Sequence, residues 1–124
     1  MQVHDWNVVS PESVTNLYRR SVAQGKNLSV ARLEVAKGAS TRRHRHEQEE
    51  AIILLRGEWL FHFPDGDVTL RPNQILTISP GLEHSSEVLE DVVAIDVCSP
   101  RRDDWILGDD HKLHYDPDQE LWAV

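Results

Sequence analysis

Residues 38–57 read GASTRRHRHEQEEAIILLRG, and this stretch decides the fold of the 124-residue chain. A glycine stands at each end, and His44, His46 and Glu50 lie between the two glycines. Two imidazoles and a carboxylate at short spacings are typical ligands of a divalent transition metal. We therefore predict that this stretch contributes to a metal site.

The even spacing of the three candidate ligands predicts that they lie on one face of a β-strand. Alternate side chains of a strand point the same way, so His44, His46 and Glu50 would face one side together. Arg42 has the same parity and would also face inward. A solvated site would hold a metal weakly, so we expect an enclosed interior such as that of a barrel. A slip in strand register would give the role of Glu50 to Gln48.

A fourth ligand is expected from His84, which follows the turn residues Pro80 and Gly81. With it the chain resembles the cupin superfamily, whose first motif is Gly, five residues, His-x-His, three or four residues, Glu, six residues, Gly. Residues 38–57 match that motif at every fixed position. The second cupin motif matches in part: Gly81 and His84 align with it, and Asn73, Ser79 and Val88 stand where it has Gly, Pro and Asn.

The resemblance implies an all-β fold, the cupin double-stranded β-helix or jelly-roll barrel. It also implies one divalent metal, for which iron, nickel, manganese, zinc and copper all suit the ligands. The chain has the length of one domain, 1–124, with a barrel core at about 28–102 and terminal arms that pack on the barrel or on a partner subunit.

Short strands separated by turn residues are predicted along the whole chain. Their predicted positions are residues 14–22, 28–35, 51–55, 68–70, 75–78 and 92–97, with a hairpin turn at 23–27. Trp59, Phe61 and Phe63 alternate with other residues, which predicts an inward aromatic row that fills the core.

A second cluster, DVCSPRR at residues 96–102, lies on the last predicted strand. Asp96 and Cys98 share a face, and burying an acid in an apolar strand is costly unless the acid is paired or functional. One interpretation is an Asp–Arg strut that closes the barrel, and the other is a role in the pocket.

This cluster is similar to a segment of the small cupins of pectin and alginate breakdown, which convert unsaturated uronates to linear ketonised sugars. The resemblance implies active-site roles for Asp96 and Arg102. It also implies the metal ligands His44, His46, Glu50 and His84, with Glu50 standing where that family has Gln. The chain departs from the family at Cys98, where the family has an aromatic residue, and at Ile52, where it has a polar one.

The expected metal site together with Asp96 and Arg102 favours isomerisation or tautomerisation of a small, oxygenated, anionic molecule, with the metal as Lewis acid. Arg102 would clamp a carboxylate, and Asp96 would move a proton at a carbon next to a carbonyl. Among the other arginines, strand parity directs only Arg32 and Arg42 inward.

Two alternatives stay open. A non-haem iron dioxygenase would suit the His, His, Glu set and a dry pocket lined by Ile52, Leu54 and Phe61. A binding protein without catalytic activity would agree with the apolar residues at Ile52 and Val88.

The composition narrows the expected partners. A net charge of −8, with a basic run only at residues 42–45, argues against nucleic acid and anionic membranes. Cys98 is the single cysteine, so an internal disulfide is excluded. Neither a signal peptide nor a spanning apolar run is present in the sequence, so we expect a cytoplasmic protein.

Open sheet edges and apolar residues in both terminal arms favour a homodimer. The arm residues concerned are Trp6, Val8, Val9, Leu121 and Trp122. The remaining histidines have no ligand spacing and are expected at the surface or in ordinary packing: His4, His62, His111 and His114.

Overall fold

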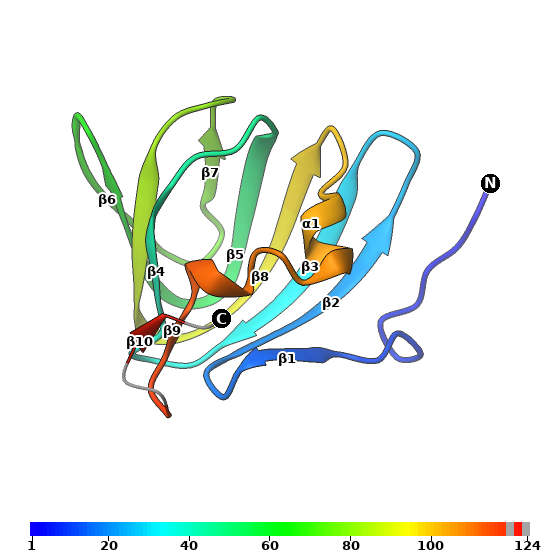
Figure 1. Ribbon diagram of the computed structural model, residues 1–124, viewed down its shortest axis with the longest axis horizontal. Helices are drawn as coiled ribbons and strands as arrows, with labels where there is room; N and C mark the ends of the chain where they lie inside the picture. Colours follow the sequence, from blue (N-terminus) through cyan, green and yellow to red (C-terminus); the bar gives the residue numbers. More distant parts are fainter. Residues whose placement is uncertain (119–120, 123–124) are drawn as a thin grey trace.

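The structure is a computed structural model that describes residues 1–118 and 121–122. Its strands are β1 (Glu12–Thr15), β2 (Tyr18–Gln24), β3 (Ser29–Val35), β4 (Ser40–His44), β5 (Glu49–Phe63), β6 (Gly66–Leu70), β7 (Ile75–Ile78), β8 (His84–Ser99), β9 (Tyr115–Asp116) and β10 (Leu121–Trp122). The helix α1 (Asp103–Leu107) and the 3-10 helix η1 (His111–Leu113) lie between β8 and β9. The strands curve around one interior, and α1 and η1 lie in front of it (Figure 1).

Two long antiparallel strands, β5 and β8, organise the barrel. The sheet runs β1-β2-β3-β8-β5-β6, with β4 paired to β8 and β7 paired to β5. The first half of β8 therefore pairs with β4, and its second half pairs with β3. This arrangement confirms the predicted all-β jelly roll. No helix in the described residues has the length and apolar character needed to cross a membrane.

The predicted strands are confirmed with changed boundaries. Residues 14–22 are split between β1 and β2 by a turn, and the hairpin turn after β2 is closed by a hydrogen bond from Gly25 N–H to Leu28 O of 2.8 Å. Residues 51–55 and the aromatic row belong to one strand, β5, and residues 92–97 form the second half of β8.

Gly57 allows β5 to bend in its middle. Its φ is +94°, and a Cβ added there would lie 2.1 Å from the backbone oxygen of Asp91. The register between β5 and β8 also shifts on both sides of Arg56. An L-residue would be strained and would clash at this position, so the last glycine of the 38–57 stretch is required for the shape of the barrel.

The core fills the barrel between the two halves of the sheet. Trp59 and Phe61 are buried, and the half-buried Phe63 packs against them, which confirms the inward aromatic row. Leu33, Leu54 and other aliphatic side chains complete the core. Asn73 takes a φ of 70°, the left-handed conformation that the glycine of the second motif would provide.

The segment after β8 packs on its own barrel. Trp105 of α1 is buried, and the guanidinium carbons of Arg20 and Arg102 lie 5.6 and 5.0 Å from its ring centroid. His114 forms a backbone bridge with Thr41 of β4. Residues 101–116 thus cover the barrel interior within one chain. The backbone of Leu121 and Trp122, which were named as arm residues for a homodimer, is described, but their side chains are not.

Candidate metal centre

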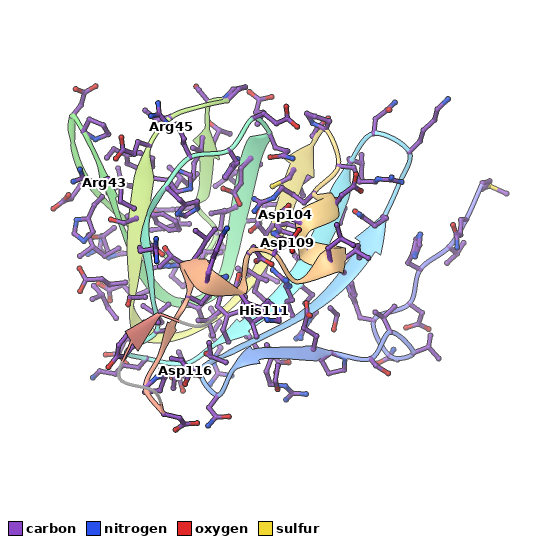
Figure 2. All side chains as sticks on the ribbon, in the orientation of Figure 1. Arg43, Arg45, Asp104, Asp109, His111 and Asp116 are labelled. Carbon is purple, nitrogen blue, oxygen red and sulfur yellow. The ribbon has the colours of Figure 1, made fainter. Side chains whose placement is uncertain are left out.

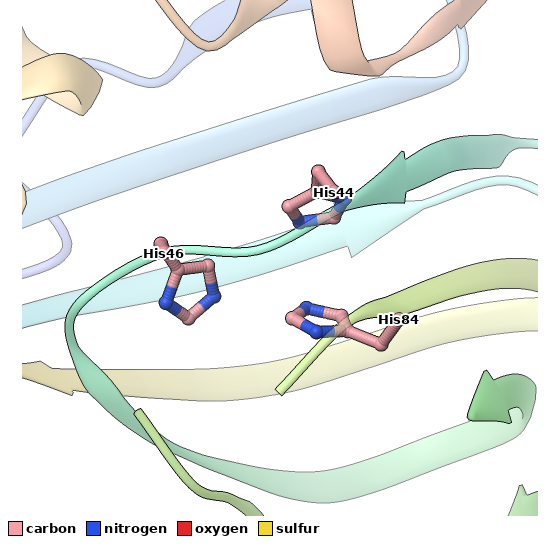
Figure 3. Close-up of side chains that lie close together, drawn as sticks. All are labelled: His44, His46 and His84. Atoms are coloured by element: carbon pink, nitrogen blue, oxygen red, sulfur yellow. The ribbon is translucent and has the colours of Figure 1, made fainter. Parts of the chain in front are cut away.

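Three histidines converge at one end of the neighbouring strands β4 and β8 (Figure 3). His44 ends β4, His84 begins β8, and these two residues are register partners in the β4–β8 ladder. His46 follows in the turn that leads to β5. Their ligand nitrogens lie within 4.8 Å of one another.

The expectation that one strand carries all the ligands of residues 38–57 is wrong. The chain turns at residues 45–48, and Glu50 lies on β5 rather than on β4. A register shift between Thr41 and His44 also breaks the alternation within β4. For this reason Arg42 is exposed and not inward. Arg43 and Arg45 are exposed on the same stretch (Figure 2).

Backbone carbonyls fix the tautomer of each histidine. In each case Nδ1 lies within hydrogen-bond distance of a carbonyl oxygen two residues away: Arg42 for His44 (2.7 Å), Gln48 for His46 (3.0 Å) and Leu82 for His84 (2.8 Å). A carbonyl only accepts, so Nδ1 donates and Nε2 keeps its lone pair. The Nε2 of His46 is buried without a hydrogen-bond partner. This donor set fits a divalent metal.

Glu50 supplies a carboxylate at the same place. Its Oε1 lies 3.3 Å from Nε2 of His46 and 3.8 Å from Nε2 of His84. Burial opposes its charge, but the neighbouring side chains of His46, Asp96 and His84 lower the pKa of Glu50 to about 2. Gln48 is also buried, yet its side chain donates to Arg101 O at 3.3 Å. The structure therefore places Glu50, and not Gln48, beside the histidines.

Asp96 and Cys98 extend the site along β8. Both are buried, and they share a face as predicted; Cys98 Sγ lies 3.8 Å from Asp96 Oδ1 and 3.7 Å from Glu50 Oε2. Burial and the charge of Glu50 raise the pKa of Asp96 well above its usual range. Asp96 thus holds a proton beside the ionised Glu50. Burial also raises the pKa of the Cys98 thiol, which therefore stays neutral.

Of the two interpretations of the second cluster, an Asp–Arg strut and a role in the pocket, the structure does not show a strut between Asp96 and Arg102. Arg102 is buried, but its Nε and Nη2 bind the two carboxylate oxygens of Asp104 at 2.8 and 2.7 Å. Asp104 lies on α1, two residues after Arg102 in the chain (Figure 2). The side chain of Arg102 therefore reaches this carboxylate without extending across the barrel. Arg102 still lines the cavity, and its Nη1 lies outside the pair with Asp104.

A buried charged pair on another side of the cavity was not predicted from the sequence. Arg20 has 2% of its surface exposed, and its Nη1 and Nη2 bind Asp110 at 2.5 and 2.8 Å. Strand parity predicted that Arg32 faces inward, but its side chain forms an ion pair with Glu34 at a partly exposed position. The inward parity that Arg20 shares with Tyr18 on β2 was the available signal.

His114 was expected at the surface or in ordinary packing, but it lines the central cavity. This cavity has a volume of about 50 Å³ and lies next to the histidine cluster. Ile52, Trp59 and Phe61 form an apolar part of its wall. Leu54, expected in the pocket, is part of the hydrophobic core instead.

Comparison with known proteins gives the family and the fold. Residues 31–98 match the family model described as a cupin domain. A search of curated proteins found no match. Among solved structures, KdgF from Halomonas sp. has a TM-score of 0.77 and 22% identity, covering 84% of this chain and 99% of that chain.

An RmlC-like cupin from Shewanella frigidimarina has a TM-score of 0.78 and 18% identity, covering 85% of this chain and 96% of that chain. A predicted oxalate decarboxylase from Thermotoga maritima has a TM-score of 0.69 and 22% identity, covering 80% of this chain and 99% of that chain. At these identities the likeness shows the fold alone.

Proposed function

The chain belongs to the cupin family, and we propose that it is a metal-dependent isomerase that converts a small unsaturated uronate to its linear keto form. The observation that carries the proposal is geometric: the buried carboxyl group of Asp96 lines the same cavity as the imidazoles of His44, His46 and His84 and the carboxylate of Glu50. Tautomerisation requires a proton donor of this kind. The similarity of residues 96–102 to the uronate-ketonising cupins supports the same choice.

The proposed metal ligands are His44, His46, His84 and Glu50. A bound divalent metal would supply a Lewis acid for the oxygen atoms of the substrate. Iron, nickel, manganese, zinc and copper all suit three imidazoles and one carboxylate.

In the proposed reaction Asp96 moves a proton to carbon. The open-chain form of an unsaturated uronate is an enol with its double bond between C4 and C5. Asp96 gives its proton to C4, the proton of the C5 hydroxyl returns to the Asp96 carboxylate, and a ketone forms at C5. No other reactant is needed, because the reaction is an isomerisation.

Arg102 is proposed to bind the carboxylate of the substrate. Its Nη1 lies outside the bidentate pair with Asp104, so the guanidinium keeps donors for a second anion. Asp104 and the ring of Trp105 hold the plane of the guanidinium in place.

The test uses the metal-loaded protein and the 4,5-unsaturated galacturonate monomer. We expect the ultraviolet absorbance of the conjugated double bond to fall faster than in the uncatalysed reaction. Asp96→Asn should lose this acceleration while it keeps its metal, and Asp65→Asn, which changes an exposed turn, should behave like the natural protein. A rate equal to the uncatalysed rate for the natural protein would contradict the proposal.

A non-haem iron dioxygenase is the second candidate. The apolar wall of Ile52, Trp59 and Phe61 favours it, because a dry pocket protects reactive oxygen chemistry. Consumption of oxygen that requires iron(II) and is absent with zinc would support this candidate over the isomerase.

A further inference from the structure

His114 reaches the cavity from the segment that covers the barrel. It follows η1 directly, and its backbone bridges Thr41 on β4. Its ring packs on Tyr18, with centroids 4.2 Å apart, and only 7% of the residue is exposed. The same cavity is lined by the candidate metal ligands and by Asp96.

The neighbours of His114 fix which of its nitrogens carries a proton. Its Nε2 lies 3.4 Å from Oδ2 of Asp110. Burial opposes the charge of Asp110, but hydrogen bonds with Arg20 and His114 hold the pKa of this carboxyl well below its usual range. An ionised carboxylate only accepts, so Nε2 is the donor and Nδ1 keeps its lone pair.

The Nδ1 atom of His114 is buried and has no hydrogen-bond partner. A buried acceptor without a partner is costly, and in a cavity wall it indicates a place for a donor from a bound molecule. Burial lowers the pKa of His114, which keeps the ring neutral near pH 7. The arrangement of a carboxylate, an imidazole and a free ring nitrogen is that of an oriented general base.

We propose that His114 accepts the proton of a hydroxyl group of the molecule bound in the cavity, with Asp110 and Arg20 as its positioning residues. For the uronate that the proposed function assigns, this hydroxyl is the one on the anomeric carbon C1. The inference therefore rests on the proposed function for its substrate, whereas the tautomer of His114 follows from the structure alone.

The step balances as a ring opening. The proton of the C1 hydroxyl passes to Nδ1 of His114, the C1–O carbonyl forms, and the bond from C1 to the ring oxygen breaks. The electron pair goes to the ring oxygen, which takes up the proton held by His114 and becomes the enol oxygen at C5. Asp110 stabilises the imidazolium that forms. His114 would thus produce the enol on which Asp96 acts.

The first test measures the tautomer of His114 by 15N NMR in the zinc-loaded protein near pH 7. We expect a proton on Nε2 and a pyridine-type Nδ1, and we expect the Nδ1 signal to shift when the unsaturated uronate is added. The assignment comes from His114→Gln, in which the signal disappears. A proton on Nδ1, or a charged ring, would overturn the proposal whether or not the protein is an isomerase.

The second test measures turnover of the same uronate. General bases contribute about 100-fold or more, so His114→Gln should lower kcat by about that factor and change KM little. His111→Gln is the matched control, because His111 lies on η1 and faces Glu12 at 3.4 Å. His114→Asn, together with metal content and melting temperature, separates a folding defect from a chemical one.

The outcomes distinguish the two proposals. If the natural protein does not accelerate the reaction, the proposed function fails, and the NMR tautomer alone decides the state of His114. If the natural protein is active and His114→Gln keeps its kcat, the uronate function stands and the role of His114 is wrong.

Discussion

His44 and His84 lie directly opposite each other in the ladder between β4 and β8, with ring centroids 4.4 Å apart. A cross-strand pair brings two side chains of one face within reach, although 40 residues of sequence separate them here. The hydrogen bond from Gly81 N–H to His46 O, 2.8 Å long, joins the turn that precedes His84 to the loop that carries His46. The backbone thus fixes the imidazoles before any metal binds.

Replacing one imidazole should therefore empty the site. We expect His46→Ala to lower metal occupancy by about tenfold or more, because the remaining ligands lose a donor of fixed orientation. Elemental analysis of the purified protein measures this change. His62→Ala is the control, since His62 lies outside the cluster and its ring contacts the carboxylates of Asp67 and Glu87. Unchanged stoichiometry in His46→Ala would remove His46 from the ligand set.

Gly57→Ala should destabilise the fold by about 2 to 4 kcal/mol. The added Cβ would meet the backbone oxygen of Asp91, and a backbone atom of a paired strand cannot move aside cheaply. Gly25→Ala is the control, because its Cβ would have ordinary contacts of 3.4 Å with Leu28. Urea unfolding measures both variants. Equal midpoints would show that the bend of β5 does not depend on Gly57.

Asp110→Asn should lower the free energy of unfolding, and the loss should be largest at neutral pH. The folded-state pKa of Asp110 is lowered, so its stabilising effect is complete above its unfolded value of about 4 and is lost as the pH falls toward the folded value. We expect a loss of about 3 kcal/mol at pH 7, since buried Arg20 loses a charged partner, and a smaller difference near pH 3.

Asp103→Asn is the control for that measurement, because its ion pair with Arg101 is exposed and contributes little. Unfolding curves recorded at several pH values give the comparison. A difference between Asp110→Asn and the natural protein that grows on acidification would show that Asp110 is not held as an anion.

A homodimer remains a prediction for the chain in solution. Val3 and Val8 in the N-terminal arm are 89% and 78% exposed, and Ile75 on β7 is 61% exposed. Apolar groups of this size and open sheet edges need covering. Light scattering at micromolar concentration should give twice the chain mass of 14.2 kDa. A mass of 14.2 kDa would refute the dimer.

The candidate ligands within residues 38–57 could be proposed from the sequence because their spacing is local, whereas the other side of the cavity could not be predicted. Residues 38–57 carry a complete motif, and Asn73 adopted the backbone that its motif position requires. Arg20 and Asp110, by contrast, are 90 residues apart, and no local spacing marks them as a pair. His114 reaches the cavity through its long-range contacts with Thr41 and Tyr18, so its place there followed only from the fold.

Arg102→Lys tests the last assignment, the carboxylate clamp. Lysine keeps the charge but loses both the fork that binds Asp104 and the planar Nη1 donors that would face a substrate. We expect kcat/KM for the unsaturated uronate to fall roughly ten- to hundredfold, which corresponds to a loss of about 1 to 3 kcal/mol of transition-state stabilisation. Arg101→Lys is the control, because Arg101 is exposed and next in the chain.

A structural role for Arg102 would give a different result from a clamp. Loss of the pair with Asp104 lowers the melting temperature in either case, but only a clamp predicts that the defect lies in KM and that saturated galacturonate also binds more weakly as an inhibitor. If the protein turns over the uronate and Arg102→Lys leaves both constants unchanged, the reaction stands. The carboxylate must then bind elsewhere, and Arg102 serves only to hold α1 against the barrel.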